Sequence, residues 1–146
     1  PLQELYNAEN RSRFFPEGCR YDYIVDAIDL VSCKLDLAET ARRLKIPLMM
    51  ALGTGNKLDP SQLRLADISE TYGCPLARVM RKELRNRGIC RQPVVFSPEQ
   101  PAPTTQRETP PPGRRSVPAS NPWVPAVAGL LIGSKVVRDL IANKGV

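Results

Sequence analysis

The chain has 146 residues, of which 42% are hydrophobic, so it is long enough to bury one small core. Its 21 Lys and Arg residues exceed 15 Asp and Glu residues, and the net charge of +6 favours a polyanionic partner. The absence of histidine excludes His-based acid–base catalysis and zinc sites with His ligands. The four cysteines form no Cys-x-x-Cys pair, so we interpret them as reduced thiols of a cytoplasmic protein.

The first part of the chain predicts a βαβ unit. Residues 1–20 are polar, and we expect irregular structure there. Residues 23–28 read as a strand, 32–44 as a helix with apolar residues at helical spacing and Ser32 as N-cap, and 46–52 as a near-continuous apolar strand. Strands that are apolar throughout are typical of parallel sheets covered on both faces. We therefore expect a mostly parallel sheet.

Further elements follow in the order strand, helix, strand. Leu63 and Leu65 alternate with polar neighbours in a third strand, residues 75–87 read as a helix closed by Gly88, and residues 94–96 as one more strand. Residues 97–122 are rich in proline and predict an extended loop. Residues 123–146 turn apolar again and predict a helix that packs back on the sheet, with Trp123 as a core anchor. The apolar stretch before Lys135 is too short for stable membrane insertion.

Two polar residues follow the first predicted strand. Open α/β sheets bind ligands at the carboxyl ends of their strands, where Asp29 lies. Lys34 comes one helical turn later and suits an anionic ligand such as a nucleotide. The alternatives are a carboxylate favoured by the helix dipole and an ordinary solvated lysine. Asp26, one strand step earlier, is a further candidate.

Gly53, Gly55 and Asn56 end the second strand at the same predicted edge. They either line a nucleotide or substrate pocket, where missing side chains allow close approach, or form a tight turn that needs positive φ. Cys74 precedes a helix that opens with Pro75, a setting that can activate a thiol. With no histidine as base, a small buried hydrophobic role is the favoured interpretation of Cys74.

A basic stripe lies on the helix predicted over residues 75–87. Four cations recur at helical spacing on one face, opposite a predicted apolar face of Leu76, Val79, Met80 and Leu84. The stripe either contacts nucleic-acid phosphates or is a solvated face. Its members are Arg78, Arg81, Lys82 and Arg85, and Arg107, Arg114 and Arg115 of the proline-rich loop could add to it.

These segments together resemble a known family. The motifs are Asp26-Ala-Ile-Asp29 with Lys34, Gly53-Thr-Gly55-Asn56-Lys-Leu-Asp-Pro60, and Cys74-Pro-Leu-Ala-Arg-Val-Met-Arg-Lys-Glu-Leu84. They resemble the C-terminal half of the dinucleotide-fold-like adenylating domain of ubiquitin-activating-like enzymes, and most closely the tRNA threonylcarbamoyladenosine dehydratases. On this resemblance, residues 1–96 are that half-domain, 97–122 a proline-rich loop, and 123–146 a C-terminal helix.

The resemblance implies ATP-dependent cyclisation of threonylcarbamoyladenosine in tRNA, by adenylation of its carboxylate. It assigns Mg²⁺ binding on the ATP phosphates to Asp29 and a phosphate contact to Lys34, and it implies a homodimer of the full-length protein. The Gly-x-Gly-x-x-Gly phosphate loop is absent from the sequence, so we expect the chain to be inactive alone. Two alternatives stay open: a sulfur-carrier-protein adenylyltransferase of the same fold, with a sulfur-transfer or carrier protein as partner, and a non-catalytic module that binds tRNA or protein.

Overall fold

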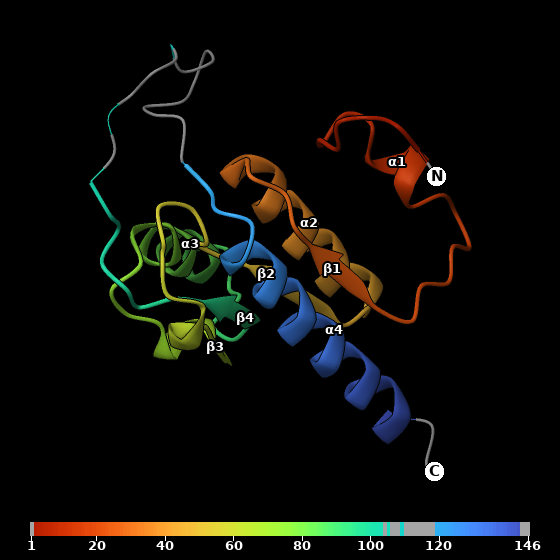
Figure 1. Cartoon of the computed structure of the whole chain (residues 1–146). Helices are drawn as coiled ribbons and strands as arrows, with labels where there is room; N and C mark the ends of the chain where they lie inside the picture. Colours follow the sequence, from red (N-terminus) through yellow and green to blue (C-terminus); the bar gives the residue numbers. More distant parts are fainter. Residues whose placement is uncertain (1, 104, 106–108, 110–118, 144–146) are drawn as a thin grey trace.

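The computed structural model describes residues 2–103, 105, 109 and 119–143, and shows a sheet with helices on both faces (Figure 1). The expected mixed α/β fold is confirmed. In chain order the elements are α1 (Arg11–Phe14), β1 (Ile24–Asp26), α2 (Val31–Leu44), β2 (Leu48–Ala51), the 3-10 turn η1 (Pro60–Gln62), β3 (Arg64–Asp67), the 3-10 turn η2 (Ile68–Glu70), α3 (Pro75–Asn86), β4 (Pro93–Phe96) and α4 (Val124–Asn143).

The described strands lie in the order β1-β2-β4-β3. β1, β2 and β4 run parallel, and β1, α2 and β2 form the predicted βαβ unit. β3 is antiparallel to β4, so it departs from the parallel arrangement of the other strands. The chain leaves β2 at the carboxyl edge of the sheet and enters β3 without a crossover helix, so β3 must run back in the opposite direction.

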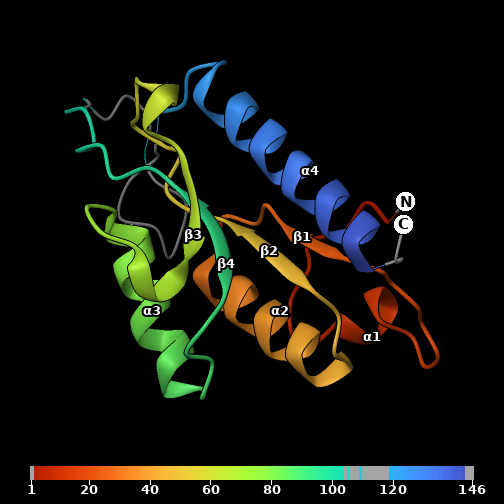
Figure 2. The same ribbon diagram turned by 90° about the horizontal axis from the view of Figure 1, so that it is seen from below.

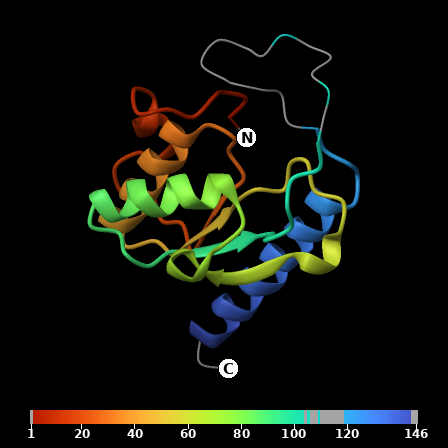
Figure 3. The same ribbon diagram turned by 90° about the vertical axis from the view of Figure 1, so that its left-hand side faces the viewer.

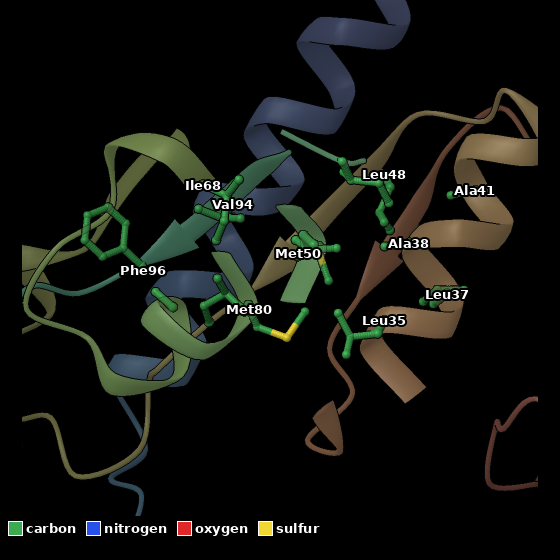
Figure 4. Packing of buried hydrophobic residues seen from close by; sticks show 14 of the residues in the cluster. Leu35, Leu37, Ala38, Ala41, Leu48, Met50, Ile68, Met80, Val94 and Phe96 are labelled. Atoms are coloured by element: carbon green, nitrogen blue, oxygen red, sulfur yellow. The ribbon is translucent and has the colours of Figure 1, made fainter. Parts of the chain in front are cut away.

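Helices cover the two faces of the sheet unequally. α2 and α3 lie side by side on one face, and α4 alone crosses the other (Figures 2 and 3). Met50 of β2 points into the larger core with α2 and α3 (Figure 4), whereas its neighbour Met49 packs with Val124 and Ala128 of α4. Because successive strand residues point to opposite faces, β2 has to be apolar throughout, as the sequence predicted.

The N-terminal residues contribute to the core, which the sequence analysis did not predict. Tyr6 is buried, and its ring meets those of Phe14 and Phe15 edge to face at centroid distances of 5.3 and 6.2 Å. The Tyr6 hydroxyl donates to the Asp36 carboxylate of α2 at 2.5 Å, and Arg11 pairs with the same carboxylate. This contact between the N-terminal arm (residues 2–20) and α2 is tertiary, so local polarity did not predict it.

Two other local predictions are wrong. α2 begins at Val31 with Leu30 as its N-cap, so Ser32 already lies inside the helix. Trp123 is 50% exposed, because Val124 and Ala128 fill the groove over the sheet.

Gly88 follows the end of α3 with φ +72°, as predicted. Within the described part of the chain, no helix combines the length and apolar character needed to cross a bilayer.

Candidate functional site

Asp29 lies in the loop between β1 and α2, past the carboxyl end of β1, and is exposed. It is therefore at the sheet edge where parallel α/β sheets bind ligands. Within residues 2–103, 105, 109 and 119–143, no group of three or more Cys, Asp or Glu side chains could hold a metal ion. The role of Asp29 as a Mg²⁺ ligand stays a prediction.

Lys34 and Asp26 form a buried ion pair just beneath this edge. Their exposed side-chain fractions are 1% and 0%, and Lys34 Nζ lies 2.7 Å from Asp26 Oδ2. Lys34 Nζ also donates to the main-chain oxygen of Ala51 at 2.9 Å, while Asp26 Oδ1 accepts from the Ile28 amide at 2.9 Å. Burial raises the pKa of the Asp26 carboxyl, and Lys34 and the Ile28 amide oppose that rise.

This pair joins the carboxyl ends of β1 and β2, and it holds the two loops that carry Asp29 and Gly53. The sequence analysis expected Lys34 to face nucleotide phosphates, but the structure shows its ammonium group engaged by protein oxygens. A phosphate contact through Lys34 stays a prediction. It would use the third donor of the ammonium group and would require a phosphate to reach a side chain that is 1% exposed. A sequence signal was available, since Lys34 lies among the apolar positions of α2, where a solvated lysine would not fit.

The loop after β2 is a tight turn that packs against Cys74, the N-cap of α3. Gly53 has φ +61°, and a Cβ atom added there would overlap the Sγ atom of Cys74. Asn56 has φ +58°, an uncommon conformation for a residue other than glycine. Positive φ and close approach are thus both present at Gly53, so the tight-turn interpretation is supported. A pocket-lining role for Gly53, Gly55 and Asn56 stays a prediction.

The polar groups of Asn56 contact both ends of the proline-rich segment. Its amide donates to the Ala119 oxygen, its Oδ1 accepts from the Ala119 amide, and its main-chain oxygen accepts from the Ala102 amide, all at 2.7 Å. These contacts fix the end of the glycine-containing loop relative to the start of α4. The sequence analysis missed this role of Asn56, because the partners lie 46 and 63 residues away in the chain.

The next residues extend this connection. Lys57 is buried and donates to the main-chain oxygen of Glu99, whose carboxylate accepts from the Leu58 amide at 2.9 Å. Asn121 Nδ2 donates to the Lys57 oxygen at 2.6 Å, and Trp123 Nε1 donates to the Leu58 oxygen at 2.8 Å. The structure therefore assigns Trp123 a hydrogen-bonding role at the base of α4 in place of the predicted core role.

Cys74 is buried and caps the N-terminus of α3. Its Sγ accepts a weak hydrogen bond from the Ala77 amide at 3.4 Å, and the side chain belongs to the core cluster with Ala77 and Met80. A thiol in this position is screened from solvent by Gly53 on one side and by the core on the other. The geometry favours the small hydrophobic role that the sequence indicated.

The basic stripe of α3 is only partly free. Arg78, Lys82 and Arg85 are exposed, whereas Arg81 is half-buried and donates to the main-chain oxygen of Thr71 at 2.6 Å and to its hydroxyl at 2.7 Å. The buried face of α3 consists of Ala77, Met80 and Leu84, and Val79 is 45% exposed. Of the predicted apolar face, Met80 and Leu84 are buried and Leu76 is partly buried against the same core, so the prediction is wrong for Val79 alone. Arg107, Arg114 and Arg115 lie outside the described residues.

Comparison with known proteins identifies the same relatives by sequence and by structure. No family model matches the chain. The chain is 36% identical over 151 aligned positions to the tRNA threonylcarbamoyladenosine dehydratase of Bacillus subtilis, covering 97% of this chain and 59% of that protein. It is 40% identical to tRNA threonylcarbamoyladenosine dehydratase 2 of Saccharomyces cerevisiae over 70% of this chain and 23% of that protein.

The fold comparison agrees with the sequence comparison. The E. coli tRNA N6-threonylcarbamoyladenosine dehydratase TcdA, solved in complex with ATP, superposes with a TM-score of 0.78 and 27% identity, covering 98% of this chain and 56% of TcdA. Its complex with AMP superposes with a TM-score of 0.79. The resemblance inferred from the sequence motifs is confirmed, and the chain spans just over half the length of the bacterial relatives.

Proposed function

We propose that this chain forms the C-terminal part of an ATP-dependent enzyme that cyclises threonylcarbamoyladenosine in tRNA. The observation that carries the proposal is the similarity over 97% of the chain to a protein named for this dehydration, together with the matching fold of a relative solved with ATP. The N-terminal part of the relatives, which the similarity does not cover, would supply the glycine-rich phosphate loop that this sequence lacks.

The proposed reaction activates the carboxylate of the modified nucleoside. Attack of that carboxylate on the α-phosphate of ATP forms an acyl-adenylate and releases pyrophosphate. An internal nitrogen or oxygen of the nucleoside then displaces AMP and closes the ring, so the carboxylate loses one oxygen overall. No protein nucleophile is needed, which agrees with the burial of Cys74.

Within this reaction, Asp29 is the residue we propose as the ligand of Mg²⁺. An exposed carboxylate at the sheet edge suits a hard cation, which takes one or two protein carboxylates together with phosphate oxygens and water. When bound, Mg²⁺ would offset the negative charge of the ATP phosphates. The Asp26–Lys34 pair would keep the loop that carries Asp29 in place, since Asp26 accepts from the amide of Ile28 next to it.

The exposed cations of the basic stripe are proposed to contact tRNA. Arg78, Lys82 and Arg85 point outward from one face of α3, and contacts to phosphates supply affinity and register without reading sequence. Replacing these three exposed residues by Gln, and leaving Arg81 bonded to Thr71, should weaken tRNA binding uniformly across tRNA sequences. We also propose that the longer protein is a homodimer, which sedimentation at several concentrations would test.

The experiment that tests the proposed function joins this chain with the missing part. We would co-express it with the N-terminal part of the Bacillus subtilis relative and supply ATP, Mg²⁺ and tRNA that carries threonylcarbamoyladenosine. Mass spectrometry of the nucleosides should show loss of one water, with release of AMP and pyrophosphate. The chain alone should show neither product nor ATP binding in calorimetry.

The matched control is Asp29→Asn in the same assembly. It should abolish product formation and leave the amount of folded assembly unchanged. An active Asp29→Asn assembly would exclude the metal role of Asp29. A purified assembly that binds ATP but adenylates a carrier-protein C-terminus, and leaves the nucleoside unchanged, would contradict the proposed reaction.

A further inference from the structure

The C-terminal ends of α2 and α3 meet at the amino ends of the parallel strands. Arg42 of α2 donates to the main-chain oxygen of Gly88, just past α3, at 2.6 Å. Arg87, the C-cap of α3, lies 3.8 Å from Glu39 of α2 and pairs with Glu83 at 2.8 Å. Figure 2 shows the two helices side by side on the same face of the sheet. Segments that are distant in the sequence thus form one surface.

Four further cations lie in or just beyond the last turns of α2 and α3, and all four are exposed. We name them the junction cluster: Arg43, Lys45, Arg85 and Arg91. In the part of the chain that the structure describes, none of the four makes an ion pair or a side-chain hydrogen bond. The two acids at the meeting point, Glu39 and Glu83, are both approached by Arg87.

Three other acids near these cations accept hydrogen bonds from other groups. Asp139, which lines one hollow together with Arg42 and Arg91, accepts from Tyr23 at 2.9 Å and from Lys135 at 2.6 Å. Asp36 feels the charge of Arg43, but its carboxylate is hydrogen bonded by Arg11 and Tyr6. Asp67 feels the charge of Arg91, and its oxygens accept from Ser69 and from the Gln92 amide at 2.9 and 3.0 Å. The junction cluster therefore presents cations to solvent, while the nearby carboxylates are bound to other groups.

Helix dipoles explain only part of this surface. Cations are favoured at helix C-termini, where they satisfy unpaired carbonyls, and Arg42 does this for the end of α3. Among the described residues, the four side chains of the junction cluster satisfy no carbonyl at either helix end. A hollow of about 540 Å³ is lined in part by Arg42, Gln92 and one member of the cluster, Arg91. Solvent-facing guanidinium and ammonium groups suit a ligand with repeated negative charges.

The position of the cluster relative to Asp29 suits a long polyanion. α2 starts directly after the loop of Asp29 and has 14 residues, so its far end lies about 21 Å away at 1.5 Å per residue. An RNA whose modified nucleoside reached the carboxyl edge of the sheet would extend its flanking backbone over distances of this order. The α3 stripe lies on the neighbouring helix, so both basic surfaces belong to the α2 and α3 side of the sheet.

We propose that the junction cluster binds the sugar–phosphate backbone of the substrate tRNA at a distance from the reacting nucleoside. The cluster adds affinity and orientation and reads no bases, because its groups are long, exposed and unpaired. This inference rests on the proposed function for the identity of the RNA. It differs from the stripe proposal, since two of its residues, Arg43 and Lys45, come from α2 and its C-cap.

The test measures binding of tRNA to the whole chain by fluorescence anisotropy over a series of salt concentrations. The variant Arg43→Gln/Lys45→Gln/Arg85→Gln/Arg91→Gln should bind at least about tenfold more weakly at low salt. The slope of log affinity against log salt should become shallower by about 0.9 for each duplex phosphate that the protein no longer neutralises. The α2 half alone, Arg43→Gln/Lys45→Gln, should produce about half of the change in slope.

Two variants serve as controls. Arg64→Gln/Arg138→Gln removes the same charge as the α2 pair from exposed positions elsewhere and should change affinity by less than about twofold, as expected for screened charges. Arg78→Gln/Lys82→Gln probes the stripe separately. Circular dichroism melts should be unchanged for all variants, because every replaced side chain is exposed.

Three outcomes would overturn the inference. They are equal losses in the Arg64/Arg138 control and the α2 pair, unchanged tRNA binding in the four-residue variant, and equally tight binding of poly-glutamate, which would indicate an acidic protein partner. Absence of tRNA binding by the unmodified chain would also contradict it. The cyclisation assay of the joined enzyme is independent of these results, so failure of the junction inference and failure of the proposed function can be told apart.

Discussion

The two ends of α2 each use a cation to hold a neighbouring segment, but in opposite surroundings. Near its start, Lys34 donates to the main-chain oxygen of Ala51 at 2.9 Å and is 1% exposed. At its end, Arg42 donates to the main-chain oxygen of Gly88 at 2.6 Å and is exposed. Both hydrogen bonds join a side-chain cation to a main-chain oxygen. What differs is that Lys34 needs the buried carboxylate of Asp26 to compensate its lost hydration, whereas water solvates Arg42.

The two edges of the sheet therefore differ in how their charged side chains are stabilised. At the carboxyl edge of the sheet, charges are buried, paired and bound to the loops of the candidate site, so their removal should disturb the fold. At the amino edge, the charges of the junction cluster are exposed, so their removal should disturb the proposed RNA binding and little else. Four changes test the distinction, and they are ordered by the size of the expected effect.

The largest effect is expected for Lys34→Met. The change leaves the Asp26 carboxylate buried without its cation, and breaking a buried pair in this way costs about 3–5 kcal/mol of unfolding free energy. Urea unfolding followed by circular dichroism measures it. Asp26→Asn/Lys34→Met should be more stable than Lys34→Met alone, because no unpaired charge remains. A loss of unfolding free energy below about 1 kcal/mol for Lys34→Met would mean that water reaches the Asp26 carboxylate. The two ends of α2 would then not differ in how their charges are stabilised.

Gly53→Ala is expected to come next. A left-handed backbone costs a residue with a Cβ about 1–2 kcal/mol, and overlap with the Cys74 Sγ adds about 1–3 kcal/mol of overpacking. Adding Cys74→Ala to the Gly53→Ala chain removes the Sγ atom, so it should restore the part of the unfolding free energy that is lost through the overlap. A double-mutant cycle on thermal unfolding isolates it. Additive effects of the two changes would show that the loop moves away from α3 easily and is not held at the carboxyl edge.

An intermediate effect is expected for Asp36→Asn, which loosens the N-terminal arm from α2. Burial raises the pKa of the Asp36 carboxyl, but hydrogen bonds from Arg11 and Tyr6 outweigh burial, so the pKa in the folded protein lies below its usual value. The contact with Arg11 and Tyr6 should contribute about 1–2 kcal/mol above the unfolded pKa of about 3.9. This stability is lost as pH falls through the lower, folded pKa.

The measurement is the stability difference between wild type and Asp36→Asn against pH. It should be constant above about pH 5 and should shrink toward zero as the pH falls through the lowered, folded pKa of Asp36. Limited proteolysis should show earlier cleavage near Phe14 and Phe15 in the variant at neutral pH, as the arm detaches from α2. A difference that stays constant through the acid range would mean that the charge of Asp36 is not what holds the arm.

The smallest effect is expected for Arg42→Gln. The change removes an exposed hydrogen bond to the end of α3, and such surface contacts contribute at most about 1 kcal/mol. Urea unfolding in low and high salt measures it, and any loss should be smaller at high salt. An effect as large as that of Lys34→Met would show that exposure does not separate the two ends of α2.

The sequence by itself determined the strands, the three longer helices and their order, but not the short helix α1, which lies where irregular structure was expected. The apolar run of β2, the helical spacing in α2 and α3, and Gly88 past the end of α3 are local patterns, and local sterics and burial periodicity are sufficient to read them. The motifs around Asp29 and Gly53 likewise predicted the relatives that the comparisons found. Asp29 also lies past the carboxyl end of β1, because chain direction alone determines which end of a parallel strand a residue follows.

The tertiary structure decided which polar groups are buried and what they contact. Lys34 is hydrogen bonded to Asp26 and Ala51, and Asn56 is hydrogen bonded to Ala119. Trp123 is exposed. β3 runs antiparallel to β4 at the edge of the sheet. It also brought the basic end of α2 next to that of α3. The reason is physical: a side chain's solvation depends on segments that are distant in the chain, and a single sequence records the periodicity of each segment but not which segments pack together.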